Sequence, residues 1–397
     1  MPQETTTRVV IVGAGPAGLA LGNLLHARGE RCVVVDKFDR RQLLGRARAG
    51  LLEYRTVATI ERMGLAKRLF AEGHRHTGCE FRSAGQRSYT DFAELYEGRS
   101  HHVYPQQEVV ADLLAGLVEA GGDVRLGVAA ERIVAGEDGV RVHLADGSTV
   151  RGEFLAGADG QHGVTRASVP EGIATEYEMR HEFQWLTLLA EAAPSADWTI
   201  YAQHERGFAG HLLRSDSVTR FHLQVPVGDA VEAWPDERVW TELRARLAYP
   251  GWTLNEGPVI SKNMLDMRSR VVEPMRFGRV FLLGDAAHII SPSGGKGMNL
   301  AVADAVELDR VLAGFDEAGG ADLSALDRYS ERRLPDIWRA QEFSHALLHM
   351  MHTYDSTTQD AAFRQRLQQS RLWQLTQSEA YATSFARSYI GPLPIIG

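Results

Sequence analysis

Apolar residues near the start of the chain form two short runs with a helical pattern between them. Arg8–Val12 and Cys32–Asp36 are almost wholly apolar, as in strands that are buried on both faces of a sheet. Leu19–Arg28 has the spacing of a helix. A strand, a helix and a strand in this order predict a β-α-β unit within a parallel sheet.

The next stretch adds a helix and a hairpin. Gln106–Ala120 has helical spacing. Val140–Leu144 and Thr149–Leu155 flank an Asp-Gly pair at 146–147, which is a strong hairpin signal. The apolar run that follows ends at Asp159, and a carboxylate at the end of a parallel strand lies where such sheets bind ligands.

From about residue 182 to residue 272, strand patterns replace the alternation of strands and helices. Within this stretch we expect one helix, Asp236–Leu247. The pattern therefore predicts an inserted antiparallel sheet that is covered on one face. Its strand runs are at 185–192, 198–204, 207–214 and 219–227.

Polar side chains gather on one face of this predicted sheet. Because side chains alternate along a strand, Arg220, His222 and Gln224 share a face, and the apolar residues between them share the other. In the preceding strand Leu212 and Arg214 also share a face. Arg214 is a permanent cation, and we expect the face that carries it to be turned toward the site.

The parallel fold resumes near the end of the chain. Arg279–Leu283 is a predicted strand, a helix is opened by residues 292–299 and runs to about Leu312, and the tail from Leu323 is mostly helical. The fold class is therefore α/β, with a Rossmann-like nucleotide-binding domain. We place its domains at 1–75 plus 97–180 plus 271–320 (nucleotide-binding), 76–96 plus 181–270 (substrate-binding sheet) and 321–397 (helical C-terminal region).

Composition narrows the function classes. The chain has 397 residues and a net charge of −8, which argues against a nucleic-acid partner. Its two cysteines, Cys32 and Cys79, lie in strand-like runs and are expected in the core of a protein from a reducing compartment. The apolar run 9–25 is interrupted by glycines and a proline, so we expect a cytoplasmic protein without a membrane partner.

The glycines after the first strand fit the G-x-G-x-x-G fingerprint at Gly13, Gly15 and Gly18. Gly13 permits a tight turn, Gly15 lets backbone approach a pyrophosphate, and Gly18 lets the helix pack against the strand. Asp36 lies where a carboxylate accepts from an adenosine ribose hydroxyl. The alternative is a glycine-rich turn that binds no ligand. Arg48, with Arg46 beside it, suits a phosphate contact.

Three separated motifs together resemble the p-hydroxybenzoate hydroxylase family of aromatic-ring flavoprotein monooxygenases. They are GAGPAG at 13–18, AGADGQHG at 156–163 and GDAAHIISPSGGKGMNLA at 284–301. The resemblance also includes IYAQHERGFA at 200–209 and SYIG at 388–391, and so spans nearly the whole chain. It implies FAD as cofactor, NADPH or NADH and O₂ as co-substrates, and a homodimer.

The resemblance also implies a set of FAD-binding residues. Asp285 would reach the ribityl chain, and the helix N-terminus at 297–299 would stabilise negative charge on the reduced flavin ring. Lys37, Phe38 and Gln42 replace the family's residues for the 2′-phosphate of NADPH, so NADPH is favoured only weakly over NADH. The cofactor-binding residues are Gly13, Gly15, Pro16, Ala17, Gly18, Asp36, Lys37, Arg46, Arg48, Gln106, Asp159, Asp285, Gly297, Met298 and Asn299.

The implied reaction is hydroxylation of an electron-rich ring that reacts best as a phenolate. Tyr201 and Tyr389 match the two tyrosines that take the substrate proton in the family, and His76 matches the surface end of that relay. The alternative for each tyrosine is ordinary core packing. The Pro292 carbonyl would face the substrate hydroxyl, and Arg220 would help to place the flavin ring.

The substrate site departs from the family pattern. Arg214 matches the arginine that holds the substrate carboxylate, but Leu212 and His222 replace a serine and a tyrosine. Gly210 replaces a bulkier apolar residue and leaves more room, and Trp185 completes the substrate-binding set. Either the substrate is still a phenolic acid resembling 4-hydroxybenzoate, or it is a larger or non-benzoate aromatic, such as one from a biosynthetic pathway.

Two further functions stay open, a flavin dehydrogenase or oxidase and a non-catalytic flavin-binding protein. A metal site is not expected. His345, His349 and His352 share a helical face, but no carboxylate partner is evident, so we expect interface or surface residues there.

Overall fold

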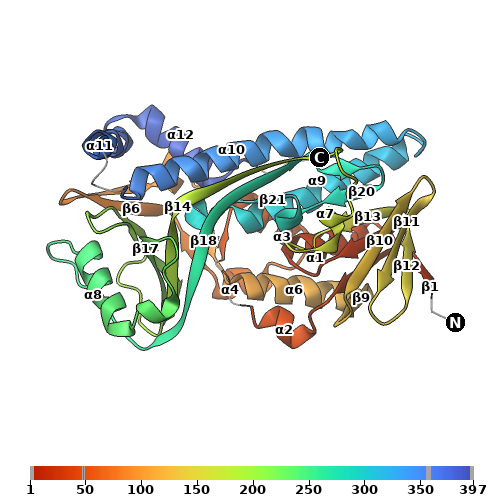
Figure 1. Cartoon of the computed structure of the whole chain (residues 1–397), viewed down its shortest axis with the longest axis horizontal. Coiled ribbons are helices and arrows are strands. Elements are labelled where there is room, and N and C mark those ends of the chain that lie inside the picture. The colour runs from red at the N-terminus through yellow and green to blue at the C-terminus, as the bar shows by residue number, and fades with distance from the viewer. Residues whose placement is uncertain (1–3, 47, 49, 355–358, 394–397) are drawn as a thin grey trace.

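The computed structural model describes residues 4–46, 48, 50–354 and 359–393. Two lobes lie along the long axis of the molecule, and the helix α10 (Arg328–Met351) runs beside both of them (Figure 1). The predicted C-terminal region is helical in its described part, whereas residues 355–358 and 394–397 lie outside the described residues.

The first lobe is built on a six-stranded sheet in the order β19-β20-β13-β2-β3-β9. All neighbouring pairs are parallel except β19 and β20, which confirms the predicted β-α-β unit. The helix α1 begins at Pro16, three residues earlier than its apolar spacing predicts, because proline suits the first turn of a helix. The bounds are β2 Val9–Val12, α1 Pro16–Ala27, β3 Cys32–Asp36, α6 Gln106–Glu119, β9 Asp123–Leu126, β13 Phe154–Gly157, β19 Arg276–Phe277, β20 Val280–Leu282 and α9 Gly297–Glu317.

The second lobe is built on an eight-stranded, mostly antiparallel sheet in the order β21-β18-β14-β17-β16-β15-β6-β7. Its two longest strands, β14 and β18, reach from this lobe to the first (Figure 1). The domain boundaries that we placed at 180/181 and 270/271 fall inside these strands. The bounds are β6 Gly78–Ser83, β7 Gln86–Asp91, β14 Thr175–Ala190, β15 Thr199–Ala202, β16 Ala209–Ser215, β17 Val218–Pro226, α8 Asp236–Leu247, β18 Val259–Glu273 and β21 His288–Ile289.

The two faces of β17 differ as the alternation predicts. Phe221, Leu223 and Val225 pack into an apolar cluster with residues of α8, which covers that face. His222 pairs across the sheet with Gly210, and Arg220 pairs with Leu212, so these four residues lie on the other face. This second face therefore carries the polar groups, and Tyr201 on the same face packs against the C-terminal helices.

The remaining elements complete the two lobes. A four-stranded sheet, β1-β12-β11-β10, contains the predicted hairpin, and a three-stranded sheet, β4-β8-β5, lies beside α3. The bounds are β1 Glu4–Thr6, α2 Arg40–Leu44, β4 Leu51–Leu52, α3 Tyr54–Arg62, α4 Lys67–Glu72, β5 His74–His76, α5 Phe92–Leu95, β8 His101–Val103, β10 Ala130–Gly136, β11 Gly139–Leu144, β12 Thr149–Gly152, α7 Val164–Ala167, α11 Ala361–Gln377 and α12 Glu379–Ile390, with short 3₁₀ turns at 231–233, 284–286, 292–294 and 323–327.

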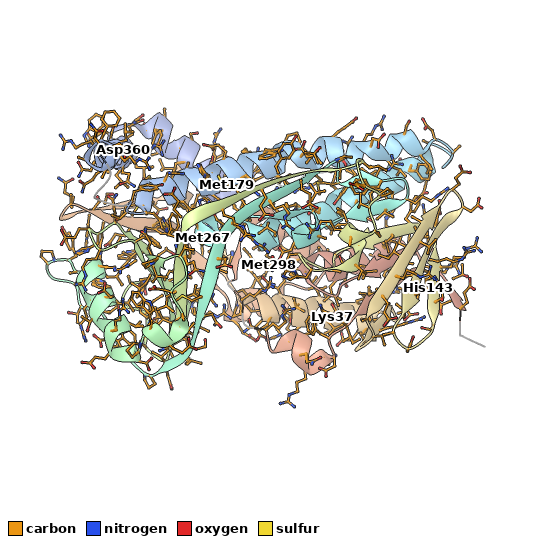
Figure 2. The ribbon with its side chains drawn as sticks, viewed as in Figure 1. Lys37, His143, Met179, Met267, Met298 and Asp360 are labelled. Atoms are coloured by element: carbon orange, nitrogen blue, oxygen red, sulfur yellow. The ribbon has the colours of Figure 1, made fainter. Side chains whose placement is uncertain are left out.

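The C-terminal helices bring the last part of the chain to the sheet of the second lobe. Tyr389 of α12 and Leu347 of α10 share one buried apolar cluster with Tyr201 of β15. Met267 of β18 and Met298 of α9 are both buried and lie near the centre of the molecule (Figure 2). No described helix is long and apolar enough to cross a membrane.

Candidate functional site

The glycine loop has the geometry that a pyrophosphate requires. Gly13 has a φ of +109°, and a Cβ there would lie 2.2 Å from the Ala158 carbonyl oxygen. A Cβ on Gly18 would lie 1.9 Å from the Gly13 oxygen, whereas nothing lies within 4 Å of a Cβ on Gly15. No side chain caps the N-terminus of α1, which leaves its N–H groups free for an anion.

Asp36 ends β3 beside this loop. Its Oδ2 accepts from the Ala14 N–H at 2.6 Å, and its Oδ1 accepts from the Phe38 N–H at 2.8 Å. These two bonds fix the carboxylate, and each oxygen keeps further acceptor capacity. Asp36 can therefore position the loop and accept from a ribose hydroxyl at once.

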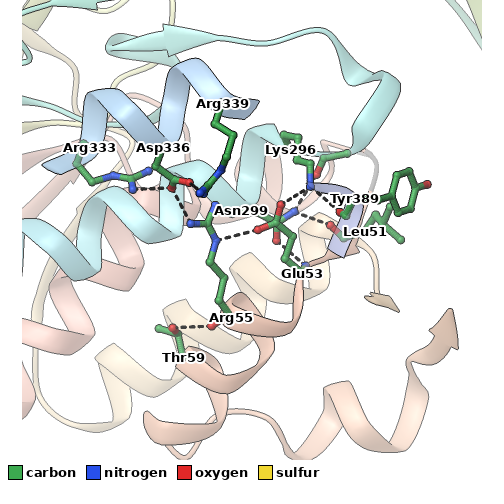
Figure 3. Close-up of polar contacts among 11 residues, drawn as sticks. Leu51, Glu53, Arg55, Thr59, Lys296, Asn299, Arg333, Asp336, Arg339 and Tyr389 are labelled. Carbon is green, nitrogen blue, oxygen red and sulfur yellow. Dashed lines mark hydrogen bonds and ion pairs between the residues drawn. The ribbon is translucent and has the colours of Figure 1, made fainter. Parts of the chain in front are cut away.

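A buried ion-pair network holds the N-terminus of α9 (Figure 3). The Lys296 Nζ donates to Glu53 Oε1 at 2.7 Å and also to the Tyr389 carbonyl, and both charged side chains are fully buried. Glu53 also accepts from Arg55, which in turn pairs with Asp336 on α10. Burial lowers the pKa of Lys296, and the charge of Glu53 opposes that shift.

The Asn299 side chain fixes the segment that precedes α3. Its Oδ1 accepts from the Glu53 N–H at 2.8 Å, and its Nδ2 donates to the carbonyls of Leu51 and Gly295 at 2.8 Å each. The Asn299 side chain is therefore fully engaged in hydrogen bonds within the protein. Only its backbone N–H, in the first turn of α9, is left to contact a ligand. Gly297 and Met298 lie in that same turn.

Tyr201 and Tyr389 meet in the core between the sheet and α12. Their hydroxyl oxygens are 2.9 Å apart, and the Tyr201 hydroxyl donates to the Ser293 carbonyl at 3.0 Å. The Cys79 thiol lies 3.3 Å from the Tyr389 hydroxyl and donates to it. Burial raises the pKa of both tyrosines. The structure thus brings together two residues that are 188 positions apart in the sequence.

His76 lies in the interior and not at the surface, so the position that we predicted for it is wrong. It is 2% exposed, its Nε2 accepts from the Thr199 N–H at 3.2 Å, and the Thr199 hydroxyl is 2.8 Å away. Burial lowers the pKa of His76 to about 4. The strand β5 is short and paired with β8, which covers the ring, and the sequence pattern gave no sign of that cover.

Two arginines lie largely buried on the polar face of the sheet. Arg214 donates to the Arg48 carbonyl at 2.7 Å and to the Gln107 Oε1 at 3.0 Å. Arg220 has an Nε without a partner, and burial together with Arg214 lowers its pKa to about 10. Among the described residues no carboxylate pairs with either guanidinium, so this face is built for an anion.

The neighbours of these arginines are mostly apolar or uncharged. Leu212 is half-buried, and His222 is buried with its Nδ1 unpartnered. Burial, with Arg220 and His352 nearby, holds the pKa of His222 well below its usual range, so the ring is neutral. Trp185 packs against His222, with ring centroids 4.5 Å apart and the ring planes tilted by 30°.

The space that we expected at Gly210 is not open. A Cβ on Gly210 would lie 3.1 Å from the ring of Phe208, so an aromatic side chain already occupies the room that the missing side chain leaves. The sequence could not show this, because the ring comes from two residues earlier and folds back over the glycine.

Comparisons with known proteins agree with this geometry. Residues 6–344 match the FAD binding domain family. The p-hydroxybenzoate hydroxylase of Acinetobacter baylyi is 37% identical over 399 residues, which cover 98% of this chain and 96% of that protein.

The chain belongs to the p-hydroxybenzoate hydroxylase family.

It is accordingly an FAD-dependent aromatic hydroxylase with the α/β flavoprotein monooxygenase fold.

The similar proteins have names that refer to different compounds. A rifampicin monooxygenase from Streptomyces venezuelae is 30% identical over 355 residues, 87% of this chain and 72% of that protein. The crystal structure of p-nitrophenol 4-monooxygenase PnpA from Pseudomonas putida matches with a TM-score of 0.83 at 20% identity, covering 98% of this chain and 99% of that one. The first likeness leaves the substrate open, and the second shows the fold.

The other residues predicted to bind the cofactor also suit FAD, which is the cofactor of this family. Asp159 is largely buried, its Oδ1 has no partner among the described residues, and burial raises its pKa. Asp285 and Arg48 are half-exposed and 3.5 Å apart. Gln106 is the first residue of α6, while Arg46 and Lys37 stack on Phe38. An orphaned carboxylate oxygen and free helix N-termini fit the hydroxyls and phosphates of FAD.

Replacing Asp285 by alanine is expected to weaken FAD binding at least tenfold, because a half-exposed carboxylate at a strand end would lose its contact with cofactor hydroxyls. FAD retained after dialysis, read from the visible spectrum, measures the effect. Asp316→Ala is the matched control, since Asp316 is half-exposed and pairs with Arg8 away from this site. Equal FAD retention in both variants would contradict the proposed role.

The sequence pattern overlooked several residues of the site. Gln107 contacts Arg214, and Cys79 contacts Tyr389. His352 is 1% exposed and accepts from the Trp185 indole N–H at 2.6 Å, so our expectation of an interface or surface residue there is wrong. The Trp185 indole N–H and the Leu348 carbonyl each form a hydrogen bond with the imidazole, and these two bonds hold the ring inside the core. Within the described residues no group of three or more side chains could hold a metal ion.

Proposed function

We propose that this chain uses NAD(P)H and O₂ to hydroxylate a phenolic aromatic acid resembling 4-hydroxybenzoate, next to its hydroxyl group. The main observation behind the proposal is the buried hydrogen bond between the Tyr201 and Tyr389 hydroxyls. The Tyr201 hydroxyl also donates to the Ser293 carbonyl. A pair of hydroxyl groups in series can take a proton from a phenol and move it away from the ring. The relative from Acinetobacter baylyi supports the same class of substrate.

FAD would supply the redox chemistry, and the protein would bind, orient and deprotonate the substrate. The phenol would lie with its hydroxyl toward the Tyr201 oxygen, and loss of its proton would make the ring more electron-rich. The Pro292 carbonyl, predicted to face this hydroxyl, already accepts from the Gly295 N–H at 3.0 Å. The buried charge of Lys296 and the N-terminus of α9 provide a positive potential that favours negative charge on the substrate and the flavin ring.

The uncompensated guanidinium of Arg214 favours a substrate with a carboxylate. A buried cation without an anion is costly, and a substrate carboxylate would remove that cost. Neutral His222 can donate or accept one hydrogen bond beside it. Phe208 fills the room at Gly210, which supports a compact benzoate over a larger aromatic.

The larger aromatic remains the second candidate because of Leu212. This side chain is apolar and offers no hydrogen bond to a carboxylate. A substrate that is neutral at this end would leave Arg214 bound only to the Arg48 carbonyl and the Gln107 amide.

The nicotinamide co-substrate and the assembly state are also part of the proposal. Lys37 and the Arg46 guanidinium, 4.6 Å from the Phe38 ring centroid, form a cationic surface that suits the additional phosphate of NADPH. A homodimer follows from the family resemblance. Phe363, Leu367 and Trp373 on α11 are between 51% and 69% exposed and would be covered by a second copy.

A substrate screen tests the proposed function. NAD(P)H oxidation is followed with 4-hydroxybenzoate, with benzoates that lack the hydroxyl, and with neutral phenols, and each product is identified by mass. We expect 4-hydroxybenzoate to stimulate oxidation and to gain one oxygen atom. Stimulation by neutral phenols alone would favour the second candidate, and oxidation without any hydroxylated product would contradict a monooxygenase.

A further inference from the structure

The hydrogen bonds of the tyrosine pair have a definite direction. A carbonyl oxygen only accepts, so Tyr201 donates to Ser293 and must accept from Tyr389. Tyr389 in turn accepts from the Cys79 thiol. If Tyr201 takes a proton from a substrate, this chain has to reverse, and Tyr389 then needs an acceptor of its own.

Cys79 is a poor acceptor for that proton. Sulfur accepts hydrogen bonds weakly, and burial raises the pKa of the Cys79 thiol, which keeps it protonated. Among the described residues, His76 forms no hydrogen bond with either tyrosine hydroxyl. Its Nε2 is hydrogen-bonded to Thr199. The path beyond Tyr389 therefore needs another polar group.

His101 lies next to Tyr389 and has no such commitment. The residue is 0% exposed, and neither ring nitrogen has a hydrogen-bond partner among the described residues. Its ring meets the Tyr389 ring edge-on, with centroids 5.0 Å apart. A fully buried histidine with two unpartnered nitrogens points to a role beyond packing.

His101 also lies beside His76. The two residues are direct partners across the antiparallel strands β8 and β5, and their ring centroids are 6.1 Å apart. The His76 Nε2 lies closer to the Thr199 hydroxyl, at 2.8 Å, than to the Thr199 N–H, at 3.2 Å. In the tautomer in which Nε2 donates to that hydroxyl, the His76 Nδ1, which has no partner, is free to accept a proton. Three unpartnered ring nitrogens thus lie in one buried cluster, which is a site that ordered water satisfies.

We propose that His101 carries the substrate proton from Tyr389 to His76, with ordered water joining its ring nitrogens to the tyrosine hydroxyl and to the His76 Nδ1. This inference rests on the proposed function of the tyrosine pair. The substrate O–H bond breaks as the Tyr201 oxygen gains its proton, Tyr201 passes its own proton to Tyr389, and Tyr389 passes one through water to a His101 nitrogen. His101 then releases a proton from its other nitrogen through water to the His76 Nδ1, and His76 releases one from its Nε2 toward the Thr199 hydroxyl, 2.8 Å away. No electrons are transferred.

The charges around His101 suit a group that passes a proton on. Lys296 lies at the Tyr389 carbonyl. His76 is the titratable group on the same face as His101, whereas His102 points to the opposite face of the strand. Burial and Lys296 lower the pKa of His101, and the Tyr389 backbone opposes that shift. The positive charge of Lys296 disfavours a stable imidazolium, and burial does the same. A neutral imidazole both donates and accepts, as a relay requires.

Proton release on substrate binding tests the inference. The FAD-loaded protein is mixed rapidly with 4-hydroxybenzoate in weakly buffered solution that contains a pH indicator, from pH 6 to 9. We expect His101→Val to slow proton release at least tenfold and to make its rate rise with pH, without a change in ligand affinity or FAD content. His101→Gln, which keeps groups that donate and accept, should restore part of the rate and serves if the valine variant does not fold.

His102→Val is the matched control, because His102 is the next residue of the same strand and its ring packs on Phe70 instead. Wild-type proton release in His102→Val is expected. Release at the wild-type rate and with the wild-type pH profile in both His101 variants would overturn the role of His101 alone. A wild-type protein that binds the ligand but releases no proton, or that does not bind it, would overturn the proposed function and this inference with it.

Discussion

Replacement of Tyr201 by phenylalanine is expected to lower the yield of hydroxylated product per NAD(P)H oxidised by about 100-fold, the usual size of an acid–base contribution. The variant keeps the ring, which stacks on Phe81 with centroids 5.7 Å apart, and loses only the hydroxyl. NAD(P)H oxidation should continue, because the change does not touch the cofactor-binding residues. The oxygen that is not inserted should appear as hydrogen peroxide.

Product and peroxide are quantified in the same reaction. The control is Tyr329→Phe, since Tyr329 is fully buried and donates to the Leu282 carbonyl at 2.8 Å, away from the tyrosine pair. That variant loses one buried hydrogen bond and should remain coupled. If Tyr201→Phe also retains wild-type coupling, Tyr201 has a packing role only.

Replacement of Arg214 by alanine is expected to weaken the binding of 4-hydroxybenzoate by roughly 3–5 kcal/mol, the loss typical of breaking a buried charge pair. Arg214→Lys should lose less, because it keeps the charge but not the planar pair of donors. His222→Phe should have the smallest effect, since His222 is neutral and provides at most one hydrogen bond.

Affinity is measured by titration of each ligand while the flavin absorption spectrum is recorded. Arg214 also donates to the Arg48 carbonyl, so the FAD content of each variant is determined first. An unchanged affinity for 4-hydroxybenzoate in Arg214→Ala would show that Arg214 does not bind the carboxylate. Such a result would favour the larger, neutral aromatic as substrate.

Local patterns predicted the parts of the fold that depend on neighbours in sequence. The glycine loop, the parallel unit around α1 and the two faces of β17 follow from spacing that is visible in a few residues. The helix α8 was predicted with the bounds that the structure shows, because turn residues flank it on both sides.

The parts that depend on distant contacts were harder to predict. His76 and His352 are buried through contacts with distant parts of the chain, Thr199 for His76 and Trp185 for His352. Phe208 folds over Gly210, which no local pattern indicates. Only the family resemblance predicted that Tyr389 lies near Tyr201. The sequence pattern could not, because the position of α12 depends on its packing against α10 and α11.

Turnover of 4-hydroxybenzoate with NADPH under ¹⁸O₂ tests the central claim most directly. We expect a dihydroxybenzoate with the new hydroxyl next to the original one, and we expect that hydroxyl to contain ¹⁸O. A product labelled from water, or NADPH consumed with peroxide as the only oxygen product, would contradict hydroxylation of a phenolic acid by this protein.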